Sequence, residues 1–225
     1  MKTIAKIHTD FPTKFGIPRQ SGLTGDLEAR IVFEPEFSSP EAVRGIEEFS
    51  HLWLIWEFSE NVRKPGNWSA TVRPPRLGGN TRVGVFATRS PFRPNPLGLS
   101  VVKLKRVEQL ENGAPVLVVT GADMMDGTPV FDIKPYVPFA DSHPEARGGF
   151  TDRTKEYELT VEIPEEILKL LPEEKRDPLC TVLAQDPRPS YQEDPRRVYG
   201  MEFAGYEVKF TVSENVLQVQ SVMKK

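Results

Sequence analysis

The stretch from Thr71 to Ser100 gathers residues that could bind an anionic ligand. It holds five arginines and five prolines but no lysine and no acidic residue, so it carries +5 in a chain whose formal net charge is −3. Guanidinium groups can form bidentate hydrogen bonds with phosphates and carboxylates, and they also stack on bases. Proline fixes the backbone that presents them, which favours a binding site over a solvated basic loop. The arginines are Arg73, Arg76, Arg82, Arg89 and Arg93.

Two further stretches carry polar side chains at suggestive spacings. In Pro18-Arg19-Gln20, a proline-fixed guanidinium and an amide could bind a carboxylate or a ribose. Asp132, Lys134 and Tyr136 alternate along the chain, so in an extended segment they share one face. That face could orient a polar substrate, and it could equally be a solvated strand face.

Several common sites are excluded by the sequence. It lacks a glycine-rich dinucleotide motif, a Walker lysine motif and a nucleophile-elbow serine. The three histidines, His8, His51 and His143, are scattered, and Cys180 is the single cysteine. We therefore expect no metal centre and no internal disulfide. A nucleotide-like ligand would have to be held by loops on a β-scaffold.

The first part of the chain reads as a set of short strands. Continuous apolar residues in His51–Phe58 indicate a strand buried on both sides, and Glu111-Asn112-Gly113 is typical of a hairpin turn. A capping pattern at Ser38 predicts a short helix that runs to Glu48. Closely spaced strands and many turn residues favour a small antiparallel barrel or sandwich, with strands at residues 3–8, 27–33, 51–58, 99–107 and 115–120.

A polar, glycine-rich stretch, residues 141–153, marks the best domain boundary. We expect a cofactor-binding and catalytic domain over residues 1–145 and a smaller α+β domain over residues 150–225. The second domain should contain a strand at 156–163, helices at 164–171 and 178–184, and a closing hairpin at 206–222. The fold class predicted is mainly β, and α+β overall.

The start of the chain, MKTIAKIHTDF, contains no signal-like apolar region, and no apolar run reaches the length of a membrane span. We therefore expect a cytoplasmic protein that does not enter a membrane. The sequence pI near 5.8 argues against a chain that is basic all over, although a local basic face remains compatible with a nucleic-acid partner.

Taken together, these motifs resemble the TsaA-like (TrmO) family of tRNA methyltransferases over nearly the whole chain. The long arginine-proline run is the most specific of them. The motifs that carry the resemblance are Pro18-Arg19-Gln20, Ala42-Val43-Arg44-Gly45, residues 49–53, 73–80, 84–90 and 92–96, Asp126-Gly127-Thr128-Pro129, residues 132–136, and Asp186-Pro187-Arg188-Pro189.

The resemblance implies a β-barrel enzyme that uses S-adenosylmethionine and works as a homodimer. It implies methylation of the exocyclic nitrogen of threonylcarbamoyl-adenosine at position 37 of threonine tRNA, beside the anticodon. It also implies the positions of the cofactor contacts. These are Pro18, Arg19, Gln20, Ser59, Glu60, Arg89, Leu99, Asp126, Gly127, Thr128 and Pro129.

The chemistry of methyl transfer to tRNA suggests candidate catalytic and tRNA-binding residues. The acceptor nitrogen is a weak nucleophile, so a group that takes its proton should help, and Asp132, Tyr136 and Asn95 are the candidate catalytic residues. The remaining arginines that we expect to contact phosphates of the anticodon loop are Arg73, Arg76 and Arg93. Arg188 and Tyr191 would form a second clamp on the tRNA.

Two other hypotheses stay open. The barrel could be a non-catalytic RNA-binding module, which explains the arginines but leaves Pro18–Gln20 and Asp126–Pro129 without a role. The same barrel could also methylate a different acceptor, such as a small molecule, which the acidic pI favours mildly.

Overall fold

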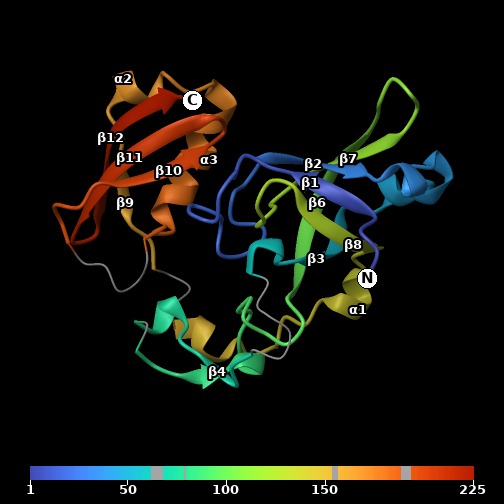
Figure 1. Cartoon of the computed structure of the whole chain (residues 1–225), viewed down its shortest axis with the longest axis horizontal. Coiled ribbons are helices and arrows are strands. Elements are labelled where there is room, and N and C mark those ends of the chain that lie inside the picture. The colour runs from blue at the N-terminus through green and yellow to red at the C-terminus, as the bar shows by residue number, and fades with distance from the viewer. Residues whose placement is uncertain (62–67, 79, 154–156, 189–193) are drawn as a thin grey trace.

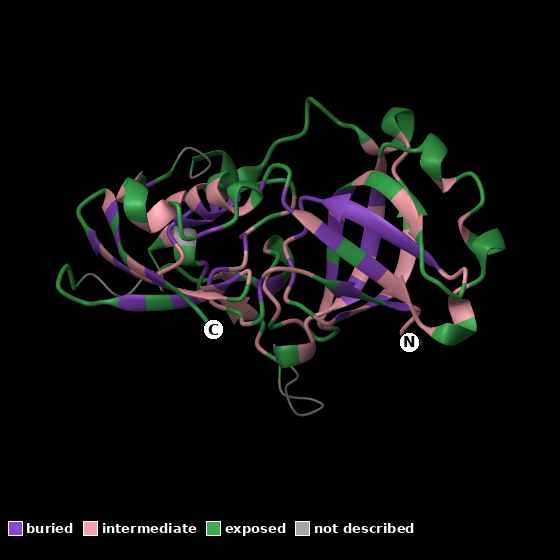
Figure 2. Cartoon of the chain, turned by 90° about the horizontal axis from the view of Figure 1, so that it is seen from above, coloured by how far each residue is buried: buried purple, intermediate pink, exposed green. Residues whose placement is uncertain are grey.

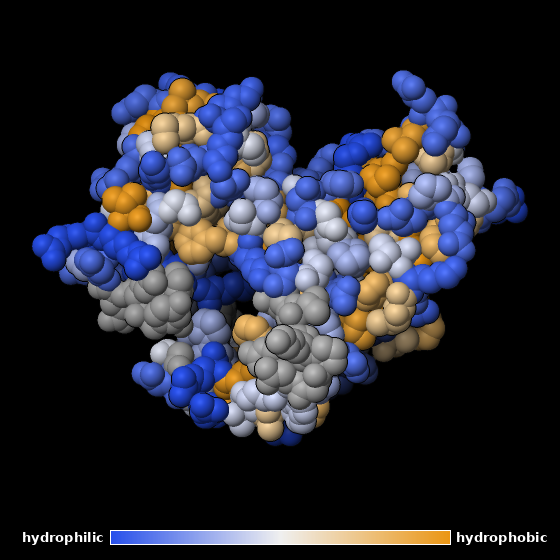
Figure 3. Space-filling model, viewed as in Figure 1, coloured by the Kyte–Doolittle hydropathy of each residue, from blue (hydrophilic) through white to orange (hydrophobic). Residues whose placement is uncertain are grey.

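The computed structural model describes residues 1–61, 68–78, 80–153, 157–188 and 194–225. Two units lie side by side, a barrel built from the first half of the chain and a C-terminal sheet with its helices (Figure 1). A notch separates them along one edge of the molecule in Figure 3. Among the described residues, no helix is both long and apolar enough to cross a membrane.

The N-terminal unit is a closed antiparallel barrel of six strands, which confirms the predicted barrel and adds one strand, residues 128–135, to the five that were expected. The strands follow one another around the barrel in the order β1-β2-β7-β6-β3-β8. Their bounds are β1 Ala5–His8, β2 Glu28–Phe33, β3 His51–Glu57, β6 Leu97–Gln109, β7 Pro115–Thr120 and β8 Thr128–Pro135. The turn between β6 and β7 has Gly113 at a positive φ of 79°, and its amide donates to the carbonyl of Leu110, which confirms the expected hairpin.

Alternation along β3 shows how the barrel core is filled. Leu52, Leu54 and Trp56 are buried, while the residues between them are only partly covered. Figure 2 shows buried and less buried stretches alternating along the barrel strands. The expectation of a strand buried on both sides was therefore wrong, because a closed barrel has one inner face and the residues on the outer face of β3 stay half-exposed. The inward side chains meet those of Ile7, Ile31 and other strands in one apolar cluster.

The expected helix ending at Glu48 was also wrong. Residues 35–48 form three short 3₁₀ helices, η1 Pro35–Phe37, η2 Pro40–Val43 and η3 Ile46–Glu48. Ser39, rather than Ser38, caps η2 by accepting from the Glu41 amide. Gly45 has a φ of 82°, which an α-helix does not allow, so the segment breaks there.

The arginine-rich stretch forms an arm that projects from the barrel (Figure 1). It contains a two-stranded sheet of β4 Thr71–Val72 and β5 Val83–Gly84. Three 3₁₀ helices flank these strands in the chain, η4 Ser59–Asn61, η5 Pro75–Leu77 and η6 Val85–Ala87. Pro74 and Pro75 follow β4 closely, and Gly78 ends η5 at a positive φ of 73°, so these elements of the arm stay short.

The C-terminal unit is a four-stranded sheet with the strand order β10-β11-β12-β9. The expected closing hairpin is present in β11 and β12, and β9 pairs with β12 in parallel. The bounds are β9 Thr160–Glu162, β10 Tyr199–Phe203, β11 Tyr206–Ser213 and β12 Val216–Lys224, with α2 Glu165–Leu168 and α3 Glu173–Ala184. Between the two units in the chain come α1 Pro138–Asp141, which lies beside the barrel (Figure 1), and η7 Gly149–Arg153.

The loop between β1 and β2 joins the two units. Its Phe11 ring lies 5.7 Å from that of Phe203, and its Phe15 stacks on Phe210 at 6.4 Å. Phe11 and Leu27 thus belong to the apolar core of the C-terminal unit. Residues from the first part of the chain therefore contribute to both units. The domain boundary expected between residues 145 and 150 stays a prediction.

Candidate functional site

A cavity of about 520 Å³ opens at one end of the barrel, where β3 ends and β6 and β8 begin. Arginines, carboxylates and apolar side chains share its wall, a mixture typical of small-molecule sites. It is lined by Lys14, Ile17–Gln20, Trp56–Glu60, Thr88, Arg89, Pro91, Arg93, Leu97–Ser100, Asp123–Met125 and Thr128.

Three loops around the cavity are tied together by hydrogen bonds. The Lys14 ammonium donates to the Glu60 carbonyl at 2.6 Å, and Arg89 Nη1 donates to Gln20 Oε1 at 2.6 Å. Arg93 Nη1 donates to the Thr88 carbonyl at 2.7 Å. These bonds hold the β1–β2 loop, η4 and the arginine arm in one arrangement around the opening.

The floor of the cavity depends on a glycine. Gly98 of β6 pairs with Trp56 of β3, and a Cβ atom added at Gly98 would lie 2.1 Å from Cε2 of the indole. The absence of a side chain lets the ring lie flat across the strand, where its Nε1 donates to Ser100 Oγ at 3.0 Å. Ser100 in turn donates to Asp123 Oδ1 at 2.6 Å.

Asp123 is a site residue that the sequence reasoning missed. Burial raises the pKa of its carboxyl, and this effect outweighs the opposing hydrogen bond from Ser100 and the nearby charge of Arg89. A carboxylate between the apolar residues Ala122 and Met124, just after a buried strand, was the signal that could have identified it.

Most of the predicted cofactor positions meet at this cavity. Those that line it are Pro18, Arg19, Gln20, Ser59, Glu60, Arg89, Leu99 and Thr128. The lining residues do not include Asp126, Gly127 or Pro129. The Asp126 carboxylate instead lies 3.1 Å from His8 Nδ1 and accepts from the Thr9 amide at 3.0 Å, so it pins the start of β8 to the end of β1.

The three candidate catalytic residues do not line the cavity as the structure describes it. Asp132 lies on the outer face of β8 and pairs with Lys134 at 3.1 Å. The Tyr136 ring packs against that of Trp53, with centroids 5.8 Å apart. Asn95 is exposed in the loop before β6, and its carbonyl accepts from the Leu97 amide. A catalytic role for them stays a prediction.

The predicted tRNA contacts differ in how exposed they are. Arg73 is exposed. Arg93, in contrast, is half-buried and bonds main-chain carbonyls of its own loop. Arg188 bonds Asp186 through two nitrogens. The side chain of Arg76 and the whole of Tyr191 lie outside the described residues.

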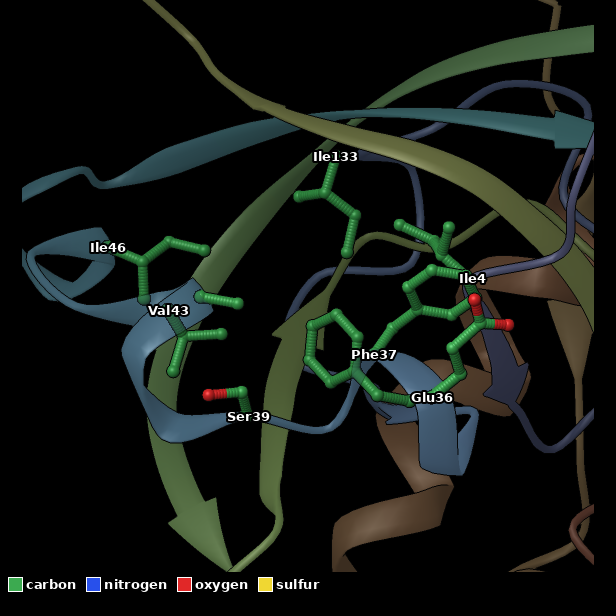
Figure 4. Close-up of a pocket in the computed structure, with 9 residues that line it drawn as sticks. Ile4, Glu36, Phe37, Ser39, Val43, Ile46 and Ile133 are labelled. Atoms are coloured by element: carbon green, nitrogen blue, oxygen red, sulfur yellow. The ribbon is translucent and has the colours of Figure 1, made fainter.

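No group of three or more potential metal ligands occurs among the residues that the structure describes. A second cavity of about 350 Å³ lies at the opposite end of the barrel. Phe37, Val43 and Ile133 project into it from η1, η2 and β8 (Figure 4). Its wall is mostly apolar and carries none of the predicted site residues.

The fold and the first cavity together define a β-barrel protein with a small-molecule site at the open end of the barrel. Residues 6–142 match the family described as tRNA-methyltransferase O N-terminal domain, and residues 156–225 match the TrmO C-terminal domain. The chain belongs to the tRNA-methyltransferase O family.

Relatives and solved structures agree with this assignment. A tRNA (adenine(37)-N6)-methyltransferase of Escherichia coli K12 is 42% identical over 96% of this chain and 94% of its own length. One of Eikenella corrodens is 48% identical over 78% of this chain and 97% of its own. The crystal structure of TrmO from Pseudomonas aeruginosa matches with a TM-score of 0.78 and 33% identity, covering 99% of this chain and 95% of that one.

Proposed function

We propose that this protein transfers a methyl group from S-adenosylmethionine to the exocyclic N6 nitrogen of adenosine 37 in tRNA. The observation that carries the proposal is the cavity at the end of the barrel, which eight of the predicted cofactor positions line. Family membership supports the reaction, because the relatives in Escherichia coli and Eikenella corrodens are named for it.

The residues of the cavity fit this cofactor. A volume of about 520 Å³ lies within the range of small-molecule sites, roughly 300–1,000 Å³. Arg19 and Arg89 are suited to the carboxylate of the methionine part. Leu99, of which 55% is exposed, offers an apolar surface for a base.

When bound, S-adenosylmethionine supplies a methyl group that is already activated by a positively charged sulfur. The chain therefore has to position the acceptor nitrogen, keep water away and take up one proton. Trp56, Phe58 and Met124 provide an apolar wall beside the polar groups. Hydrogen bonds between the loops hold that wall in place before any ligand arrives.

At a finer level, we propose threonylcarbamoyl-adenosine of threonine tRNA as the substrate and the cytoplasm as the place of reaction. The exposed Arg73 is suited to a phosphate of the anticodon loop. We also propose a homodimer. Large apolar side chains on and beside the arm support it, since Phe86 is 72% exposed and Trp68 is 46% exposed.

The test compares two forms of threonine tRNA, one with the threonylcarbamoyl group and one without it. The purified protein is incubated with each and with S-adenosylmethionine, and methylated nucleosides are quantified. We expect transfer to the threonylcarbamoyl form. Equal transfer to both would contradict the finer substrate assignment, and transfer only to small acceptors would contradict the tRNA assignment. If the protein binds tRNA but neither binds the cofactor nor transfers a methyl group, a non-catalytic RNA-binding module is favoured.

A further inference from the structure

Asp123 lines the cavity, whereas none of the three predicted catalytic residues does. It follows β7 and is flanked by Ala122 and Met124, both of which are buried in the barrel core. Its carboxylate, together with Ser100 and Trp56, lines the cavity floor. A half-buried carboxylate in a ligand cavity needs a hydrogen-bond partner or a function, because removing a charge from water is costly.

Two successive hydrogen bonds fix the orientation of the Asp123 carboxylate. The Trp56 ring N–H can only donate, so Ser100 Oγ must accept from it. The hydroxyl proton of Ser100 then points to Asp123 Oδ1, at 2.6 Å. Asp123 therefore receives a hydrogen bond from the barrel wall, and this bond favours a proton-accepting carboxylate whose orientation is fixed before substrate binds.

The charges around Asp123 are mixed. Burial raises its pKa, while Ser100, its own main-chain amide, Arg89 and the Ser21 amide lower it by less. A carboxyl group with a raised pKa is a better proton acceptor near neutral pH than an exposed one. The other charged groups that line the cavity are Lys14, Arg19, Glu57, Glu60 and Arg93.

We propose that Asp123 is the catalytic residue that accepts the proton released by the exocyclic nitrogen of the acceptor adenosine. In the step, a bond forms between that nitrogen and the methyl carbon and the carbon–sulfur bond breaks. The nitrogen loses one proton, and a carboxylate oxygen of Asp123 takes it. This inference rests on the proposed methyl transfer to tRNA, and it replaces the outer-face residue Asp132 in this role.

The direct test combines a titration with single-turnover kinetics. In the unsubstituted protein, carbon-13 NMR of labelled aspartate should show Asp123 titrating above the ordinary aspartate pKa of about 3.9. Asp123→Asn keeps the shape of the side chain and can still accept from Ser100. We expect it to lower the single-turnover rate on tRNA by about 10²- to 10⁴-fold. Calorimetry should show its affinity for S-adenosylmethionine changed by less than about threefold, well under the tenfold that 1.4 kcal/mol represents.

Two further variants sharpen the test. Asp26→Asn, which changes an exposed aspartate outside the cavity lining, is the control, and it should retain the rate and its dependence on pH. Ser100→Ala removes a hydrogen bond that lowers the pKa of Asp123. The acidic limb of the rate profile should therefore move to higher pH in that variant.

Three results would overturn the inference. One is a weakened cofactor affinity with an unchanged rate at saturating cofactor in Asp123→Asn, which would make the carboxylate a binding group. Another is that Asp132→Asn, and not Asp123→Asn, abolishes the fall in the rate at acidic pH. The third is an Asp123 carboxyl that titrates at an ordinary pKa. Methyl transfer by the unsubstituted protein is measured in the same series, so failure of the proposed function is seen separately.

Discussion

Arg188 holds the carboxylate of Asp186 with two nitrogens of its guanidinium group, Nε to Oδ1 at 2.8 Å and Nη2 to Oδ2 at 2.9 Å. The side chains of this pair are only 12% and 11% exposed. The main-chain carbonyl of Asp186 accepts from Arg19 Nη2 at 2.6 Å. The pair thus connects the C-terminal unit to the wall of the cofactor cavity.

This connection changes the role expected for Arg188. A second clamp on tRNA phosphates would need a guanidinium group turned to solvent, whereas this one is engaged by a carboxylate. Burial alone would raise the pKa of Asp186, but the hydrogen bonds from Arg188 and Tyr157 outweigh it and hold the pKa below its usual range. We expect Arg188 to act by positioning Asp186 and, through it, Arg19.

Arg188→Ala tests that role. It leaves a nearly buried carboxylate without its partner, so we expect the free energy of unfolding to fall by about 3 kcal/mol. Affinity for S-adenosylmethionine should fall about tenfold, because Arg19 loses an oriented acceptor. Denaturant unfolding and calorimetry measure the two effects. Arg196→Ala, which changes an exposed arginine in the same unit, is the control. Unchanged cofactor affinity together with weakened tRNA binding would restore the original assignment.

Gly98→Ala should damage the cavity floor. The added methyl group meets the Trp56 ring at 2.1 Å, so the indole must move and its bond to Ser100 must break. We expect destabilisation of about 1–3 kcal/mol, typical of overpacking, and a loss of cofactor binding. Gly84→Ala is a matched control, since nothing lies within 4 Å of the added atom there. Wild-type cofactor affinity in Gly98→Ala would contradict this account of the floor.

Arg73 and Arg93 should behave differently. Arg73→Ala removes an exposed charge, so the slope of log affinity for tRNA against log salt should flatten by about one. Arg93→Ala instead removes bonds to the carbonyls of Thr88 and Ser90, and we expect it to weaken cofactor binding by loosening the loop that carries Arg89. Filter binding over a salt series and calorimetry separate the effects. The same flattening with intact cofactor binding in Arg93→Ala would make it a phosphate contact after all.

Glu28 should contribute to stability in a defined pH range. Hydrogen bonds from Arg106 and Lys105 lower its pKa to about 2. Because the pKa is lower in the folded state, the contribution is present above the unfolded value, about 4.3, and is lost as the pH falls towards 2. The Glu28 side chain is 36% exposed, so solvent screening limits the effect of Glu28→Gln at pH 7 to less than about 1 kcal/mol. Thermal unfolding at pH 7 and pH 3 measures it, and an equal loss at both values would contradict the assignment.

The strands of the barrel were predictable because their residues alternate or form short apolar runs between turn signals. Local pattern could not show that β3 has an outer face, since that follows from closure of the barrel by strands distant in sequence. The segment at residues 35–48 carried a capping signal, but Gly45 and its positive φ decided its structure. Elements held by short-range chemistry were predicted well, and those set by distant contacts were not.

The predictions for the candidate site divide in the same way, into residues that a local motif reveals and residues whose role depends on distant contacts. Arginines fixed by proline and the Pro18-Arg19-Gln20 motif were visible in the sequence, and the cavity brings Arg19 and Arg89 together. Asp123 was missed because its place in the cavity depends on a half-buried hydrogen bond from Ser100, 23 residues away. The pairing of Arg188 with Asp186 was likewise invisible to motif reading, since an arginine in a loop reads as solvent-facing.

The most direct test of the central claim is the destination of the methyl group. Bulk tRNA from a strain that lacks this gene is incubated with the purified protein and S-adenosylmethionine labelled in its methyl group. Labelled nucleosides are then identified and mapped in the tRNA sequence. The account predicts label on the exocyclic nitrogen of adenosine 37 and no label when the cofactor cavity is disabled by Arg89→Ala. Label at another position, or none in RNA while cofactor binding persists, would contradict it.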